Sequence, residues 1–166
     1  MRWNLRITKC GHTFFMMLSE TQTLEGVTSL LDNGKHIVLW DMERCFQEQA
    51  EESLRYPQHK YNLSNIYLFS DLARSFRAWC FTQVEFKTYL KILLDTKYVD
   101  WNFFYYTVKR KKATLRVSNK KNRPRQRLVG VLESYTMPMP EICEKVVYDT
   151  GIEKRGRSIL LGDVDG

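Results

Sequence analysis

The chain has 166 residues, enough for one domain with its own hydrophobic core, and 43% of them are hydrophobic. This composition excludes a disordered chain, and the lack of a long apolar run predicts a soluble protein that does not interact with membranes. The net charge of +7 favours polyanionic partners. Arg2, Arg6 and Lys9 interrupt the apolar run that a signal peptide needs near the N-terminus. We therefore expect no signal peptide and place the protein in the cytoplasm.

The first third of the chain alternates strand and helix patterns. A stripe of Leu24, Val27, Leu30 and Leu31 predicts a helix that Asn33-Gly34 ends. The apolar run that follows this glycine is typical of a buried strand. A later polar stretch is expected to be helical and to stop before Pro57. The predicted elements are strands at 3–8 and 13–18, a helix at 19–33, a strand at 36–40 and a helix at 44–56.

Short strands dominate the prediction for the rest of the chain. Apolar residues at helical spacing between Glu85 and Asp95 indicate one amphipathic helix. The other predicted elements are strands at 65–69, 75–81, 103–109 and 113–118, a basic turn at 119–125 and an ordered segment at 128–135. We expect one domain at 1–136, with an N-terminal unit at 1–35 and the functional motifs at 36–136. Residues 137–166 form a predicted C-terminal appendage.

Carboxylates stand at the ends of two predicted strands. Asp41 and Glu43 follow the strand at 36–40, and side chains two apart project from the same face of a strand. Asp100 stands at the start of the predicted strand after Val99. Hard oxygen ligands suit Mg²⁺ or Mn²⁺, and two such ions catalyse in-line displacement at phosphorus. We therefore predict that Asp41, Glu43 and Asp100 are catalytic metal ligands. The alternative is that Asp41 and Asp100 are strand-end or cap residues.

Between the carboxylates, Arg74, Ser75 and Arg77 form a candidate phosphate site, since arginine binds phosphate with two parallel hydrogen bonds. After Asp100, ten of the 26 basic residues lie between Lys109 and Arg127, a segment without an acidic residue. The rest of the chain contains 16 basic and 19 acidic residues. Such a local excess is typical of a polyphosphate-binding surface.

Three motifs thus precede the basic segment, namely Asp41-x-Glu43, Ser75-x-Arg77 and Val99-Asp100. Their order resembles the archaeo-eukaryotic primase superfamily, particularly its PrimPol-like branch, with motifs Asp-x-Asp/Glu, Ser-x-His and hydrophobic-Asp. The resemblance covers roughly residues 36–127, and Arg77 replaces the family's motif II histidine.

The resemblance implies an α/β (α+β) fold: a mixed sheet with flanking helices, an RNA-recognition-like palm and a small N-terminal α/β unit. It implies a metal-dependent nucleotidyltransferase, a primase-polymerase that acts on single-stranded template and primer with nucleoside triphosphates and Mg²⁺ or Mn²⁺. A helicase or larger replication subunit is a further expected partner. The predicted nucleotide-binding residues are Arg74, Ser75, Arg77, Arg116, Ser118 and Lys120. The predicted nucleic-acid-binding residues are Lys109, Arg110, Lys111, Lys112, Lys121, Arg123, Arg125 and Arg127.

Two other functions stay open at this point. The chain is then either a non-catalytic module that binds single-stranded nucleic acid or nucleotides, or a two-metal nuclease. Two further metal sites are weaker alternatives. Cys10 with His12 has no second ligand pair at zinc spacing, and Asp163 with Asp165 is more typical of a solvated chain end. The four cysteines lack a CxxC pair and are expected to be reduced thiols.

Overall fold

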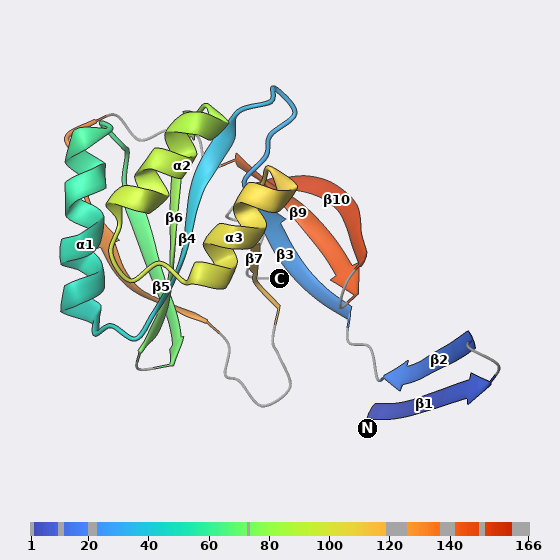
Figure 1. Ribbon diagram of the computed structural model, residues 1–166. Helices are drawn as coiled ribbons and strands as arrows, with labels where there is room; N and C mark the ends of the chain where they lie inside the picture. The colour runs from blue at the N-terminus through green and yellow to red at the C-terminus, as the bar shows by residue number, and fades with distance from the viewer. Residues whose placement is uncertain are drawn as a thin grey trace.

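The computed structural model describes residues 2–9, 12–19, 23–72, 74–118, 126–136, 142–149 and 152–160, with side chains for 25–70, 74–118 and 126–136. Within these residues the fold is mixed α+β, as predicted (Figure 1). The helices are α1 (Gln47–Lys60), α2 (Phe86–Asp95) and α3 (Trp101–Arg110). The strands are β1 (Arg2–Lys9), β2 (His12–Ser19), β3 (Thr23–Thr28), β4 (His36–Glu43), β5 (Ile66–Leu72), β6 (Ser75–Val84), β7 (Thr114–Arg116), β8 (Arg127–Leu132), β9 (Ile142–Asp149) and β10 (Ile152–Leu160).

The main sheet is antiparallel, with the strand order β4-β6-β5-β8. Along the chain β4 leads through α1 to the β5–β6 hairpin and then to α2. After α2 the chain returns along the free edge of β4, where Val99 makes an antiparallel bridge to Met42. The order is therefore β-α-β-β-α-β, with the last strand reduced to one bridge. This return places Asp100 beside Asp41.

The hydrophobic core lies between the main sheet and the two helices α1 and α2, which cover one face (Figure 1). Trp40, Ala78 and Leu68 are neighbours across three strands on this face and are 0% exposed. The indole Nε1 of Trp40 donates a hydrogen bond to Thr96 Oγ1 at 3.0 Å, just beyond α2. Tyr89 of α2 donates to the carbonyl of Leu39 at 2.6 Å. Burial and these two bonds fix α2 against β4.

The opposite face of the main sheet carries a different row of side chains. Asp41, Arg77 and Phe69 are neighbours across β4, β6 and β5. Because successive side chains of a strand alternate between faces, this row lies opposite the one with Trp40. The carboxylate of Asp41 is therefore on the face that α1 and α2 leave uncovered.

A second sheet joins distant parts of the chain in the order β10-β9-β3-β7. The central strand β3 pairs with β7 on one side and with β9, from the predicted C-terminal appendage, on the other. A third sheet is the hairpin β1–β2, whose two strands correspond to the predictions at 3–8 and 13–18. Figure 1 shows this hairpin apart from the other elements.

Strands at 36–40, 65–69 and 75–81 and the helix at 85–95 are confirmed as β4, β5, β6 and α2. The short β7 lies within the predicted strand at 113–118, and β8 begins one residue before the ordered segment at 128–135.

Two predicted elements are wrong, and a third has the wrong ends. Residues 19–33 do not form a helix where the structure describes them, because β3 pairs on both sides and Gly26 disfavours a helix interior. Residues 103–109 are not a strand but belong to α3. The helix predicted at 44–56 is confirmed as α1, but it begins at Gln47 and continues through Pro57 to Lys60. Pro57 is buried against the core, and only one turn follows it before the helix ends.

His36, at the start of β4, makes stability depend on pH. Its ring is 3% exposed, lies 5.1 Å from the Phe86 ring, and has Nδ1 3.0 Å from Ser29 Oγ. Burial lowers the pKa of His36 below its ordinary value of 6.5, and the charge of Glu85 opposes this shift only in part. The unfolded chain therefore takes up the proton first, so the native state loses stability as the pH falls below 6.5.

The expected slope in this range is up to about 1.4 kcal/mol per pH unit. Urea denaturation of the wild type and of His36→Gln between pH 7.5 and 5 measures it. The variant should lose most of the slope. An equal slope in both proteins would contradict the assignment to His36. The pKa of Asp95 is lowered chiefly by a hydrogen bond from Lys60, so its contribution is lost at more acidic pH.

Candidate functional site

Asp41 and Asp100 come from different elements and are joined through the backbone. Asp41 is near the end of β4, and its carbonyl accepts a hydrogen bond of 2.8 Å from the backbone N–H of Asp100. The N–H of Glu43 in turn donates to the carbonyl of Tyr98 at 3.0 Å. These two bonds flank the bridge between Met42 and Val99 and fix the position of Asp100 relative to β4.

Asp100 is the N-cap of α3 and does not begin a strand, which corrects the prediction. Its carboxylate accepts hydrogen bonds from the backbone N–H groups of Asn102 at 3.0 Å and Phe103 at 3.3 Å. An aspartate at this position satisfies orphan donors of the first turn and interacts favourably with the helix dipole. The cap holds the carboxylate in a defined orientation at the start of α3.

A pocket of about 240 Å³ opens beside these two carboxylates. Its lining comes from β4, from α3 with the residues that flank this helix, and from β7. Figure 1 shows α3 and β7 on the side of β4 away from α1. Two acidic and two basic side chains therefore converge on one small cavity. The lining residues are Asp41, Asp100, Asn102, Phe103, Tyr106, Thr107, Arg110, Lys112 and Thr114.

Glu43 lies outside this lining, although it shares a strand with Asp41. Its side chain is exposed at the end of β4. Across the side chains that the structure describes, no group of three or more His, Cys, Asp or Glu residues is arranged to hold a metal ion. The structure therefore brings together two of the three predicted ligands, Asp41 and Asp100.

Arg77 is a cation next to Asp41 on the neighbouring strand. The two residues are register partners, and Nε of Arg77 lies 3.7 Å from Oδ1 of Asp41. The guanidinium is buried, with its side chain 8% exposed. Ser75 is the register partner of Glu43 at the start of β6. Arg74 is exposed, and its guanidinium lies 4.6 Å from the centre of the Phe46 ring.

Ser118, just after β7, links this segment to β3, and Arg116 is hydrogen-bonded to Ser118. The guanidinium of Arg116 donates to the carbonyl of Ser118 at 2.7 Å, and the hydroxyl of Ser118 accepts from the backbone N–H of Glu25 at 3.0 Å. Neither side chain lines the pocket. Lys120, the third predicted nucleotide contact of this segment, lies outside the described residues.

The basic segment begins at the end of α3. Lys109 and Arg110 are in the last helical turn, where cations interact favourably with the helix dipole. Lys111 ends the helix in a left-handed conformation with φ of 55°, which directs the chain to Lys112 at the pocket. Arg127 is the first residue of β8. The predicted contacts Lys121, Arg123 and Arg125 lie outside the described residues.

Four polar lining residues are not among the site residues predicted from the sequence, namely Asn102, Tyr106, Thr107 and Thr114. The first three are on α3, which was predicted to be a strand or its lead-in. The hydroxyl of Thr114 is buried and makes no hydrogen bond to the residues that the structure describes. Unsatisfied buried hydroxyls are rare and are often associated with ligand sites. If the segment is taken as a helix, Asn102, Tyr106 and Arg110 are four residues apart and therefore lie on one face of it. This spacing is the sequence feature that could have identified them.

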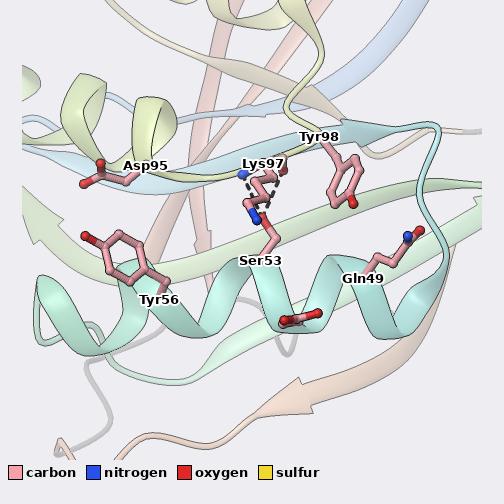
Figure 2. Close-up of a pocket in the computed structure, with 7 residues that line it drawn as sticks. Gln49, Ser53, Tyr56, Asp95, Lys97 and Tyr98 are labelled. Atoms are coloured by element: carbon pink, nitrogen blue, oxygen red, sulfur yellow. Dashed lines mark hydrogen bonds between the residues drawn. The ribbon is translucent and has the colours of Figure 1, made fainter.

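A second cavity of about 410 Å³ lies between α1 and the return segment after α2, as Figure 2 shows. Its walls include the exposed rings of Tyr56 and Tyr98. Ser53 Oγ accepts from the backbone N–H of Lys97 at 2.8 Å and lies 3.1 Å from its carbonyl, to which it donates (Figure 2). Tyr98 has φ of 63°, unusual for a bulky residue. These contacts hold the segment that positions Asp100.

In the described parts of the chain, no helix combines the length and apolar character that crossing a membrane requires. Comparison of the chain with protein-family models, with curated proteins and with solved structures finds no match.

Proposed function

We propose that the chain is a primase-polymerase palm, a metal-dependent nucleotidyltransferase that acts on a single-stranded template. The observation that carries the proposal is the meeting of Asp41 and Asp100 at one pocket that also contains Arg110 and Lys112. Acidic residues suit a divalent cation, and basic residues suit the phosphates of a nucleotide. The order of the three motifs along the β-α-β-β-α-β unit agrees with the primase resemblance.

The donor set at this pocket fits one Mg²⁺ or Mn²⁺ ion. Mg²⁺ is commonly held by one or two carboxylates together with substrate phosphates, and Asp41 and Asp100 supply two. Both are hard oxygen donors. When bound, the ion would neutralise charge that develops on the phosphates during transfer. A second ion would require Glu43, whose exposed side chain is outside the pocket lining.

The cations have separate roles in the proposal. Arg110 and Lys112 would bind the triphosphate, since both line the pocket. Arg77 would orient Asp41 through the ion pair of 3.7 Å.

The second candidate is a non-catalytic module that binds single-stranded nucleic acid or nucleotides. The Arg77–Asp41 pair favours it, because a carboxylate already paired with a permanent cation attracts a metal ion less strongly. The lack of a three-ligand metal group among the described side chains agrees with this alternative.

An incorporation assay separates the two functions. The protein is incubated with a single-stranded template, with and without a primer, labelled nucleoside or deoxynucleoside triphosphates, and Mg²⁺ or Mn²⁺. We expect labelled product that requires the metal ion, and chelation by EDTA should abolish it. Template binding without product under either metal would reject nucleotidyl transfer and support the binding module.

A further inference from the structure

The surface of α3 carries large aromatic side chains that the core does not use. Trp101 is 71% exposed, Tyr105 is 50% exposed and Tyr106 is 47% exposed. Trp101 and Tyr105 are four residues apart, so they lie on the same side of the helix, about 6 Å apart along its axis. The helix thus presents a stripe of flat apolar rings to solvent.

Cations continue this stripe towards the C-terminal end of α3. Lys109, four residues after Tyr105, and Arg110 are both exposed. The guanidinium of Arg110 lies 5.2 Å from the centre of the Tyr106 ring. From Trp101 to Arg127 the sequence contains no acidic residue. Aromatic rings beside positive charge match the chemistry of single-stranded nucleic acid, whose bases stack and whose phosphates pair with cations.

The stripe is continuous with the proposed catalytic pocket. Tyr106 and Arg110 line that pocket with Asp41 and Asp100. The ring of Tyr105 packs edge-on against Tyr106, with 5.3 Å between ring centres. A strand stacked on Trp101 and Tyr105 therefore lies along the pocket rim.

We propose that α3 is the base-stacking surface for a single-stranded nucleic acid, with Trp101 and Tyr105 as the stacking residues and the exposed Lys109 and Lys111 as phosphate contacts. This inference rests on the proposed function and gives α3 as the place where its single-stranded template binds. Stacking needs unpaired bases, so the surface selects single strands over duplex.

Binding of a fluorescein-labelled oligothymidine of about 12 nucleotides to the full chain tests the proposal, with fluorescence anisotropy measured over a range of salt concentrations. We expect Tyr105→Ala to weaken binding about tenfold, and the double variant Trp101→Ala, Tyr105→Ala about a hundredfold. The slope of affinity against salt should not change, because the phosphate contacts remain. Tyr56→Ala is the matched control, since Tyr56 is also exposed, at 56%, but lies on α1.

Tryptophan fluorescence gives an independent measurement. Trp101 is exposed, whereas Trp40 is 0% and Trp79 4% exposed. In a Trp3→Phe background, unlabelled oligothymidine should quench the emission of Trp101. A Trp101→Phe variant should lose the quenching but bind within about threefold, because phenylalanine can still stack.

Several results would overturn the inference. Binding of the double variant within twofold of the wild type would show that the rings do not stack. A reduced salt slope in that variant would show that its loss is electrostatic. A wild-type dimer that Trp101→Ala dissociates, measured by sedimentation, would show that a second chain covers the stripe. If the rings stack on the oligonucleotide but no nucleotide is incorporated, only the proposed function is rejected. If nucleotides are incorporated but the rings do not stack, only this inference is rejected.

Discussion

If the proposed function holds, replacement of Asp41 by asparagine is expected to reduce nucleotide incorporation by about a thousandfold, because the proposed metal ion would lose a carboxylate ligand and with it several kcal/mol of charge stabilisation. Asparagine keeps the shape of the side chain and an oxygen at the position from which Asp41 Oδ1 forms its ion pair with Arg77 Nε at 3.7 Å. The variant should therefore fold. Its product yield under saturating Mn²⁺ and its circular dichroism spectrum are the measurements.

Glu43→Gln is the matched control for Asp41→Asn. It removes the same charge two residues further along β4, outside the pocket lining. We expect a loss of about tenfold or less, from the weaker field at the site. Equal losses in both variants would contradict the two-carboxylate site and favour the three-ligand arrangement predicted from the sequence. Asp100→Asn should preserve the helix cap, since asparagine caps as well as aspartate, and still reduce incorporation.

Replacement of Trp40 by alanine is expected to lower the free energy of unfolding by about 3–5 kcal/mol. Trp40 is 0% exposed, and its indole donates to Thr96 Oγ1, which itself donates to the carbonyl of Ile92 at 2.8 Å. The change leaves a large cavity between β4 and α2. Because a domain is stable by only about 5–15 kcal/mol, the melting temperature should fall by roughly 10 °C or more. Urea denaturation and thermal melting measure the effect.

Trp101→Ala removes the same side chain from an exposed position and serves as the comparison. Its free energy of unfolding should stay within about 0.5 kcal/mol of the wild type. Similar destabilisation in both variants would show that Trp101 packs into the fold, and would contradict the exposed surface inferred for α3. This comparison also shows whether binding defects of the Trp101 variant arise from misfolding.

The elements that could be predicted are those whose own residues decide their structure. The buried strand β4 follows a glycine and is almost wholly apolar, and α2 has a clear amphipathic stripe. The helix α3 was mistaken for a strand because its aromatic and β-branched residues favour strands in general. The cap at Asp100 and the buried pair Phe103 and Thr107, four residues apart, indicate its helical character.

β3 was mistaken for a helix because its pairing depends on residues far away. Thr23–Thr28 pairs with β9, which begins at Ile142, and with β7, which begins at Thr114. Such long-range pairing overrides local preference and leaves no signal in a short window of sequence.

Only part of the candidate site could be predicted, because the rest depends on structure that the local sequence does not determine. The motif order identified Asp41 and Asp100, and the return of the chain after α2 brings them together. The polar residues of α3 could not be identified while that segment was assigned to a strand. The separation of Glu43 from the pocket depends on the geometry of the strand end, which the spacing of two residues does not determine.

The pairing of β3 with β9 has a consequence for biosynthesis. Ribosomes release the chain from its N-terminus, so β3 emerges long before Ile142–Asp149 exists. Both edges of β3 are unpaired until β7 emerges, and the edge that pairs with β9 stays unpaired after that, while β4, α1, β5, β6 and α2 can already assemble from nearby segments. A fragment that ends at residue 136 never contains β9, so this edge of β3 stays unpaired. Such a fragment should fold its main sheet and yet associate through β3.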